Sequence, residues 1–207
     1  LAVILSVVEE NIKEQKNPQN PTAYFVSFLA LLNQSFKDEE IIDQSLATST
    51  AYFLDLVFPF VPKPLLKAKF SDILIKLAPA ITNEDSEAPL IRSCIGALET
   101  LLIAQDAKAW SSKLNISPWR ALQALLDLSL DHRPKIRKRA QESINKILSN
   151  PPPSPTVGHV AGNPCSEFAL KSIVDLLNSS EVKSKKPNKE LNAQLIHNLQ
   201  LIQTISS

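Results

Sequence analysis

A run of basic residues between positions 130 and 150 carries the most evident chemistry of this sequence. The segment LDHRPKIRKRAQESINKILSN contains five cations in seven residues: Arg133, Lys135, Arg137, Lys138 and Arg139. A cation at a helix N-terminus faces the positive end of the helix dipole and costs about 0.3–1 kcal/mol when exposed. Such a cluster is suited to binding anions, either RNA phosphates or an acidic protein segment.

Four of these cations are candidate binding residues. The apolar stripe of the predicted helix consists of Ile136, Ala140, Ile144 and Ile147, so the cations that project outward or sideways are Arg133, Lys135, Lys138 and Arg139. One interpretation is a solvated face, partly balanced by Asp131 and Glu142. The other is a site for RNA or an acidic partner. An acid placed C-terminal to its lysine, as Glu142 is to Lys138, makes the weaker helical pair, so full internal compensation is not expected.

Two further arginines, Arg92 and Arg137, have a structural interpretation. Both follow a proline by three residues, in APLIRSCIGALETLL and RPKIRKRAQESINKIL, and they are 45 residues apart. This distance matches the period of HEAT and armadillo repeats. We predict that each arginine pairs with an aspartate at the turn between two helices, and Asp127 or Asp131 would serve Arg137.

The remaining residues predict no catalytic site. The three histidines, His132, His159 and His197, have no cysteine or carboxylate at metal-ligand spacing. Three isolated glycines form no phosphate-binding loop, and no nucleophile elbow occurs. Cys94 and Cys165 are expected to be reduced and buried. We therefore expect a protein that is not an enzyme, with no cofactor, metal or small-molecule substrate.

Composition narrows the class of protein. A net charge of +1 argues against wholesale coating of nucleic acid, and 44% hydrophobic residues suffice for a sizeable core. The opening LAVILSVVEE lacks the features of a signal peptide, and the run YFLDLVFPFVP is too short to span a bilayer. We expect a soluble intracellular chain without membrane contact. Since it begins with leucine and contains no methionine, we expect an interior piece of a longer protein.

The elements that would position these residues are helices. Fifteen prolines against three glycines disfavour hairpin-rich folds, and several prolines mark helix starts, as in Asn20-Pro21, Ser117-Pro118 and Arg133-Pro134. Apolar spacing predicts helices at about 2–15, 21–34, 38–60 (broken near Ala47), 63–80, 87–105, 117–131, 134–149, 164–179 and 188–205, with a short turn within 106–116 and no convincing strand.

These helices and the 45-residue period predict an all-α, α-α superhelix of HEAT or armadillo type. We expect about five helical hairpins that form a single solenoid segment over residues 1–207. The PPPSP run belongs to a Pro-rich inter-helix loop at 151–163, for which polyproline II is the expected conformation.

The segment DHRPKIRKRAQESINKILSNPPPSPTVGHVAGNPCSEFAL resembles the ribosomal RNA-processing protein 12 family, especially its fungal members. The resemblance rests on the RPKIRKRAQ core, the PPPSP run, the His159 loop and the helix after it. It implies a HEAT-repeat scaffold of the nucleolus and nucleus that associates with pre-ribosomal particles. It also implies roles in small-subunit pre-rRNA processing, pre-40S maturation and nuclear export, with shuttling to the cytoplasm as a further expectation.

Two alternatives stay open at this point. The first is a protein like the nuclear transport receptors, which would bind a small GTPase or Phe-Gly repeats, so transport components are a second class of partner. The second is a generic helical scaffold, such as a vesicle-coat or phosphatase-regulatory repeat.

Overall fold

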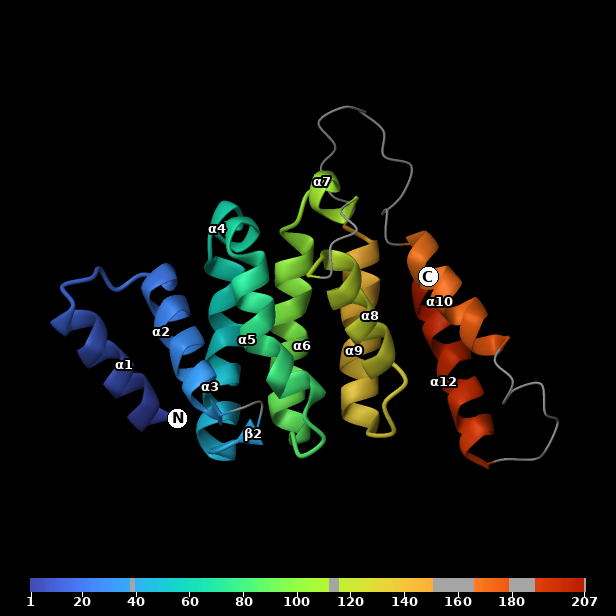
Figure 1. The fold of residues 1–207 in the computed structure, drawn as a ribbon, viewed down its shortest axis with the longest axis horizontal. Helices are drawn as coiled ribbons and strands as arrows, with labels where there is room; N and C mark the ends of the chain where they lie inside the picture. Colours follow the sequence, from blue (N-terminus) through green and yellow to red (C-terminus); the bar gives the residue numbers. More distant parts are fainter. Residues whose placement is uncertain (38–39, 112–115, 151–165, 179–188, 207) are drawn as a thin grey trace. The chain divides into compact units, whose positions relative to one another are not determined.

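The computed structural model describes residues 1–37, 40–111, 116–150, 166–178 and 189–206. It divides into two compact units, the N-terminal unit (residues 1–104) and the C-terminal unit (residues 105–207). In both units the described residues are mostly helical (Figure 1). None of the described helices combines the length and the hydrophobicity that crossing a bilayer requires.

The N-terminal unit is a stack of packed helices. The elements are α1 (Ala2–Glu14), α2 (Pro21–Gln34), α3 (Gln44–Val57), the 3-10 turn η1 (Phe58–Phe60), α4 (Lys63–Ala68), α5 (Phe70–Thr82) and α6 (Ala88–Ile103). Helix α2 packs on α1 and α3, while α6 packs on α3 and α5. These contacts bury the hydrophobic core of the unit, which includes Phe28, Leu54, Leu77 and Ile95.

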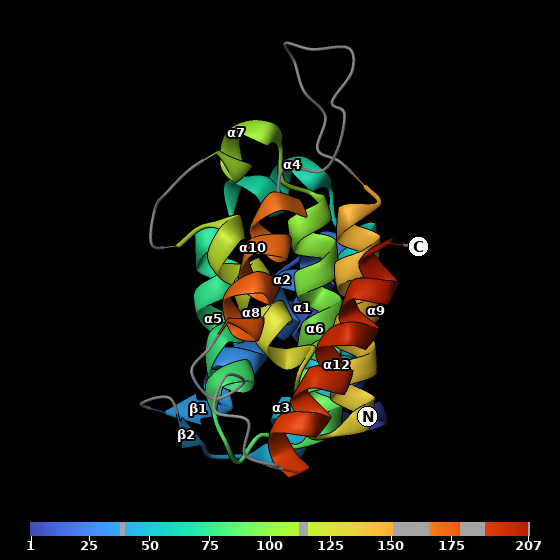
Figure 2. The same ribbon diagram turned by 90° about the vertical axis from the view of Figure 1, so that its right-hand side faces the viewer.

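The C-terminal unit repeats this type of packing. It contains α7 (Ala107–Trp110), α8 (Pro118–Leu128), α9 (Pro134–Leu148), α10 (Ser166–Leu177) and α12 (Lys189–Ser206). Helices α8 and α9 form an antiparallel pair, on which α10 and α12 pack (Figure 2). All four residues of the predicted α9 stripe, Ile136, Ala140, Ile144 and Ile147, are buried, as the sequence predicted.

Short-range signals explain where several helices begin. The Asn20 side chain accepts a hydrogen bond from the backbone N–H of Ala23 at 2.9 Å, and Asp43 does the same for Leu46 at 2.9 Å. Such N-caps satisfy backbone donors that have no partner within the helix. Pro21, Pro118 and Pro134 each occupy the first helical position, where no N–H is needed.

Two predicted helices differ from the structure. Near the start of the predicted helix 38–60 the structure has instead the strand β2 (Glu40–Ile41), which pairs antiparallel with β1 (Phe36–Lys37), so the prediction of no strand was wrong to this extent. Because Asp43 caps the following helix, α3 begins at Gln44 and continues past Ala47 without a break. The predicted helix 63–80 is two helices, since the backbone of Lys69 (φ −102°, ψ 14°) leaves the helical region.

The predicted repeat is confirmed in its geometry. Arg92 and Arg137 lie at matching positions, three residues after the helix prolines Pro89 and Pro134. Each stands on the second helix of a packed pair, α5–α6 and α8–α9. The all-α helical-repeat class is therefore established. That one solenoid continues through both units stays a prediction, and the predicted loop at 151–163 lies outside the described residues.

Candidate anion-binding surface on α9

The turn between α8 and α9 places one carboxylate against the cationic start of α9. Asp131 Oδ1 accepts hydrogen bonds from the backbone N–H of Arg133 at 2.7 Å and from its Nε at 3.0 Å, and Oδ2 accepts one from Nη2 at 2.8 Å. Only 12% of the Asp131 side chain is exposed. This two-oxygen pair with a planar guanidinium is a charge-assisted arrangement, stronger than an ordinary hydrogen bond.

The electrostatics of the turn follow from this pair. Burial by itself would raise the pKa of Asp131, but the side-chain and backbone hydrogen bonds from Arg133 outweigh burial and lower the pKa below its usual value. The hydrogen bond from Asp131 in turn raises the pKa of Arg133. Arg133 is thus a neutralised part of the turn, and its cost at the helix N-terminus is offset locally.

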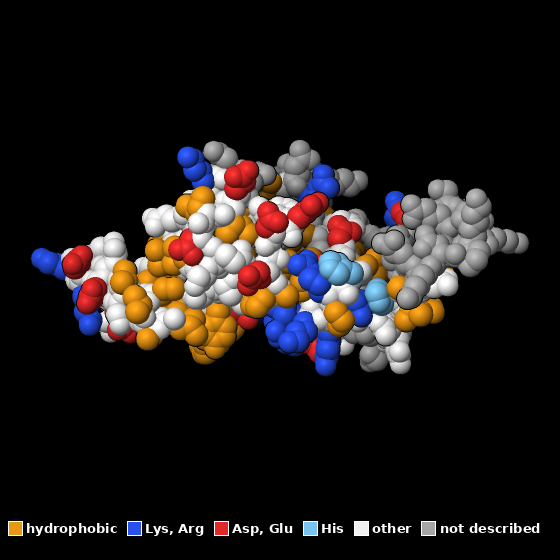
Figure 3. All heavy atoms as spheres, turned by 90° about the horizontal axis from the view of Figure 1, so that it is seen from below, with side chains coloured by type: hydrophobic (Ala, Val, Ile, Leu, Met, Phe, Trp, Pro, Cys, Tyr) orange, Lys and Arg blue, Asp and Glu red, His pale blue; other side chains and the backbone are white. Residues whose placement is uncertain are grey.

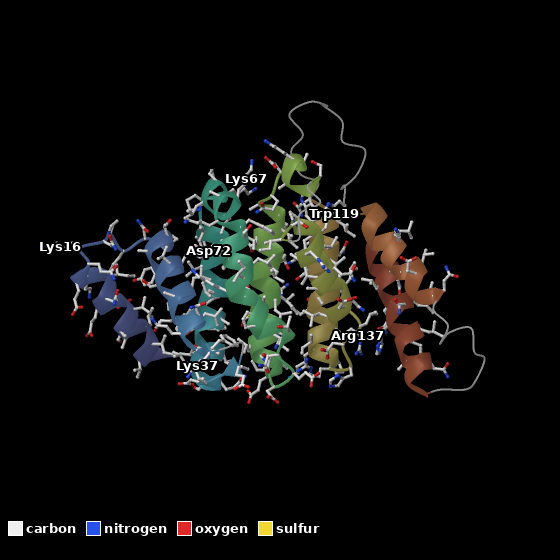
Figure 4. The ribbon with its side chains drawn as sticks, in the orientation of Figure 1. Lys16, Lys37, Lys67, Asp72, Trp119 and Arg137 are labelled. Atoms are coloured by element: carbon white, nitrogen blue, oxygen red, sulfur yellow. The ribbon has the colours of Figure 1, made fainter. Side chains whose placement is uncertain are left out.

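Arg137 has a structural role, but its partner differs from the prediction. Its Nη1 donates to the backbone carbonyl of Asp131 at 2.8 Å and to that of His132 at 3.4 Å, because Arg133 already occupies the Asp131 carboxylate. Figure 4 shows Arg137 near the end of α9 that adjoins this turn. The predicted pairing of Arg137 with an Asp127 or Asp131 carboxylate was therefore wrong, and the arginine satisfies turn carbonyls instead.

The predicted aspartate partner of Arg92 is also missing. Arg92 is exposed on α6, and within the described part of the chain it forms no ion pair. The matching positions of Arg92 and Arg137 thus do not bring matching contacts.

The other three predicted cations, Lys135, Lys138 and Arg139, differ in their contacts. Lys138 lies 3.9 Å from Glu142 Oε1, and 80% of its side chain is exposed, so this pair contributes little. Arg139 Nη1 donates to the hydroxyl of Ser143 at 3.1 Å. Lys135 is exposed and forms no ion pair with any described residue.

One more lysine joins these three on the same side of α9. At 100° per residue, Lys146 lies in line with Lys135 and Arg139, eleven and seven residues earlier. Lys146 is exposed, and the sequence reasoning missed it although the helical spacing was there to find it. We call Lys135, Lys138, Arg139 and Lys146 the α9 cationic face. On the C-terminal unit, Lys and Arg side chains gather beside the two described histidines (Figure 3).

The opposite flank of this region is a polar contact between α9 and α12. Gln141 Nε2 donates to the carbonyl of Ser129 at 3.1 Å and lies 3.5 Å from the carbonyl of His197. Burial, and next the nearby charge of Arg137, lower the pKa of His197. Burial and the nearby guanidinium thus both disfavour the charged form of this imidazole at the contact between α9 and α12.

The remaining residues singled out from the sequence are the possible metal ligands, the two cysteines and the PPPSP run. In the described residues no group of three or more His, Cys, Asp or Glu side chains is arranged to hold a metal ion. Cys94 is buried and unpaired, as predicted. Cys165, His159 and the PPPSP run lie outside the described residues.

Comparison with known proteins adds evidence that geometry alone does not provide. A family model described as "RRP12-like, N-terminal HEAT repeats" matches residues 1–207. The "Ribosomal RNA-processing protein 12" of Saccharomyces cerevisiae is 45% identical over 100% of this chain and 18% of its own length. A Schizosaccharomyces pombe relative is 32% identical over 94% of this chain and 16% of its own length. The human "RRP12-like protein" is 28% identical over 72% of this chain and 11% of its own length. The chain thus spans less than a fifth of the length of these relatives.

Proposed function

Because this chain belongs to the family with RRP12-like N-terminal HEAT repeats, we propose that it is a non-catalytic scaffold segment of a ribosome biogenesis factor. The factor would act in small-subunit pre-rRNA processing, pre-40S maturation and nuclear export. Its place would be the nucleolus and nucleus, with shuttling to the cytoplasm. The supporting observation is a match to the family over the full chain, together with an exposed cationic face on α9.

The α9 cationic face is the proposed contact with pre-ribosomal RNA. Its first and last cations, Lys135 and Lys146, are eleven residues apart, which is about 16 Å along a helix at 1.5 Å per residue. The residues of this stripe are polar, since the apolar side chains of α9 face the core. Protein partners usually require apolar contacts at the centre of an interface, whereas phosphates require only positive charge, so RNA is favoured over an acidic protein.

We infer different parts for the four cations predicted from the sequence. Lys135, Lys138 and Arg139 would contact phosphate, while Arg133 would hold the turn through Asp131. Charge reversal at Arg133 therefore tests the turn, and charge reversal at the other positions tests binding.

The experiment compares two charge-reversed variants of the whole factor in cells. Lys135→Glu with Lys138→Glu removes two contacts of the proposed face. Lys13→Glu with Lys16→Glu makes the same change in net charge on exposed residues of the N-terminal unit. We expect only the first variant to sediment less with pre-ribosomal particles, while both retain the circular dichroism of the wild type.

Binding to RNA in vitro sharpens this comparison. Each phosphate contact contributes about 0.7 to 0.9 to the slope of log affinity against log salt, so losing two contacts would reduce the slope by about 1.5. An unchanged salt slope together with unchanged particle association would refute the RNA contact. Reduced particle association without any RNA affinity of the wild type would point to an acidic protein partner instead.

A further inference from the structure

A second surface, on α3 and η1 of the N-terminal unit, is apolar and exposed. Tyr52, Leu56 and Phe60 are spaced four residues apart, and 45%, 50% and 70% of their respective surfaces are exposed. We call these three residues the α3 apolar stripe. Exposed hydrophobic side chains gather in patches on the N-terminal unit (Figure 3). Large hydrophobic residues grouped on a surface mark interaction sites more often than isolated ones do.

The stripe is not the face by which α3 packs in its own unit. Helix α3 contacts α2 and α6 through its buried residues Ala47, Ala51 and Leu54. At 100° per residue, Tyr52 and Leu56 lie on the opposite side of the helix from these three. The stacking of helices within the unit thus leaves the stripe uncovered.

Aromatic contacts hold one end of the stripe in place. The ring of Tyr52 lies 5.9 Å from that of Phe53, which stacks on the buried ring of Phe28 at 5.0 Å. At the other end Phe60 stands between the buried residues Phe58 and Val61. A surface that is already ordered loses little conformational entropy when a partner binds.

Positive charge adjoins the stripe at its Phe60 end. The segment from Leu56 to Ser71 contains three lysines and no acidic residue. These lysines, Lys63, Lys67 and Lys69, are all exposed, and Figure 4 shows Lys67 on α4, which follows η1 directly. A ligand for this surface therefore needs an apolar face and negative charge near one end.

We propose that the α3 apolar stripe is a docking site for an acidic amphipathic helix of a partner protein. The helix would place its own apolar side chains, at intervals of three and four residues, against Tyr52, Leu56 and Phe60. Its carboxylates would approach Lys63, Lys67 and Lys69. This site is separate from the α9 cationic face, involves a different class of partner and does not depend on the proposed RNA contact.

The test uses a fluorescein-labelled peptide of about 16 residues, long enough to form a helix on binding. Leucine occupies every third or fourth position and glutamate most of the others. Two control peptides are used. One has the same composition in shuffled order, and the other has lysine in place of every glutamate. Fluorescence anisotropy with the full chain is expected to show binding of the acidic amphipathic peptide, and much weaker binding of both controls.

Variants locate the binding site. Leu56→Ser with Phe60→Ser is expected to weaken binding about tenfold or more, as loss of central apolar contacts does. Ile75→Ser is the matched control, since Ile75 on α5 is 57% exposed and lies outside the stripe. Lys63→Glu is expected to weaken binding, while the same change at exposed Lys13 is not. Circular dichroism verifies that each variant is folded.

Several outcomes would overturn the proposal. These are no binding of the acidic peptide at concentrations up to about 1 mM, equal binding of the shuffled or basic peptide, or unchanged binding to the Leu56/Phe60 variant. Self-association of the wild type that the same variant abolishes, seen by analytical ultracentrifugation, would assign the stripe to a second copy of this chain instead.

Discussion

Replacing Asp131 by asparagine is expected to destabilise the C-terminal unit and, at the same time, to strengthen its binding to RNA. The asparagine amide keeps one oxygen that can accept a hydrogen bond from the backbone N–H of Arg133, which lies 2.7 Å from Oδ1 in the wild type. The negative charge is lost. In the wild type Arg133 Nη2 donates to Oδ2 at 2.8 Å, and in the variant an amide donor faces Nη2 instead.

The magnitude follows from the geometry of this pair. Hydrogen bonds to charged groups are worth about 1.5–3 kcal/mol when buried, and exposed ion pairs about 0–1 kcal/mol. The Asp131 side chain is 12% exposed and that of Arg133 31%, which places the pair between these limits. We expect the free energy of unfolding to fall by about 1–2 kcal/mol.

Urea denaturation followed by tryptophan fluorescence measures this change in the relevant unit. The two tryptophans of the chain, Trp110 and Trp119, both lie in the C-terminal unit, with ring centroids 5.4 Å apart. With a denaturant slope of about 2 kcal/mol/M, the midpoint would fall by about 0.5–1 M. Asp127→Asn is the matched control, because exposed Asp127 accepts a hydrogen bond from the uncharged side chain of Gln123 at 2.9 Å, and its replacement is expected to cost less than about 0.5 kcal/mol.

The pH dependence of the difference provides a second check. The pKa of Asp131 is lowered in the folded state, so its stabilising effect is fully present above the unfolded pKa of about 3.9. This effect is lost as the pH falls through the folded pKa. Wild type and variant are therefore expected to differ fully at pH 7 and to converge in strong acid.

RNA affinity is expected to rise in Asp131→Asn, although stability falls. Without the carboxylate, the Arg133 guanidinium becomes available to phosphate, so RNA affinity at low salt rises and the salt slope increases by about 0.9. Equal stability of wild type and Asp131→Asn at pH 7 would refute the argument that this carboxylate offsets the cationic turn. Weaker RNA binding by the folded variant would show that Arg133 contributes to binding only when Asp131 positions it.

Three further predictions concern other parts of the molecule. Burial raises the pKa of the Cys94 thiol to about 12, so in a Cys165→Ser background a thiol reagent is expected to label Cys94 only as the N-terminal unit unfolds; rapid labelling of the native chain would contradict this. The lowered pKa of His197 means that the unfolded state binds more protons between the folded and unfolded pKa values, so stability of the C-terminal unit is expected to decrease as the pH falls through about 6.5. His197→Gln, measured by tryptophan fluorescence, is expected to remove this part of the pH dependence. Asn20→Ala removes the N-cap of α2 and is expected to cost the N-terminal unit about 1 kcal/mol by circular dichroism in urea, whereas Asn20→Asp retains most of the stability.

Much of the helical architecture could be read from local signals. The stripe from Ile136 to Ile147 predicted the buried face of α9, and Pro21, Pro118 and Pro134 predicted helix starts to within a residue. Such signals act between residues within one or two helical turns, so they can be recognised from the sequence without the tertiary structure. The small β1–β2 pair and the break at Lys69 were missed, because strand pairing and the position of the short helix α4 depend on neighbours beyond one turn.

At the candidate site the structure corrects the contacts that the sequence predicted, while binding by these residues stays a prediction. Spacing alone identified the cationic start of α9 and the equivalence of Arg92 with Arg137. It could not tell which cation takes the Asp131 carboxylate, and the structure gives it to Arg133 and leaves Arg137 with backbone carbonyls.

The sequence by itself determined the helices, their repeat and the excess of positive charge on α9, because periodicity and composition are properties of the chain. The tertiary structure alone decided which charges are available to a partner and which apolar residues remain uncovered. Both outcomes depend on distances of a few ångströms between side chains, and several helices contribute to them. For that reason Arg133 is a structural residue while Lys135 is exposed, and Tyr52, Leu56 and Phe60 form a surface and not part of a core.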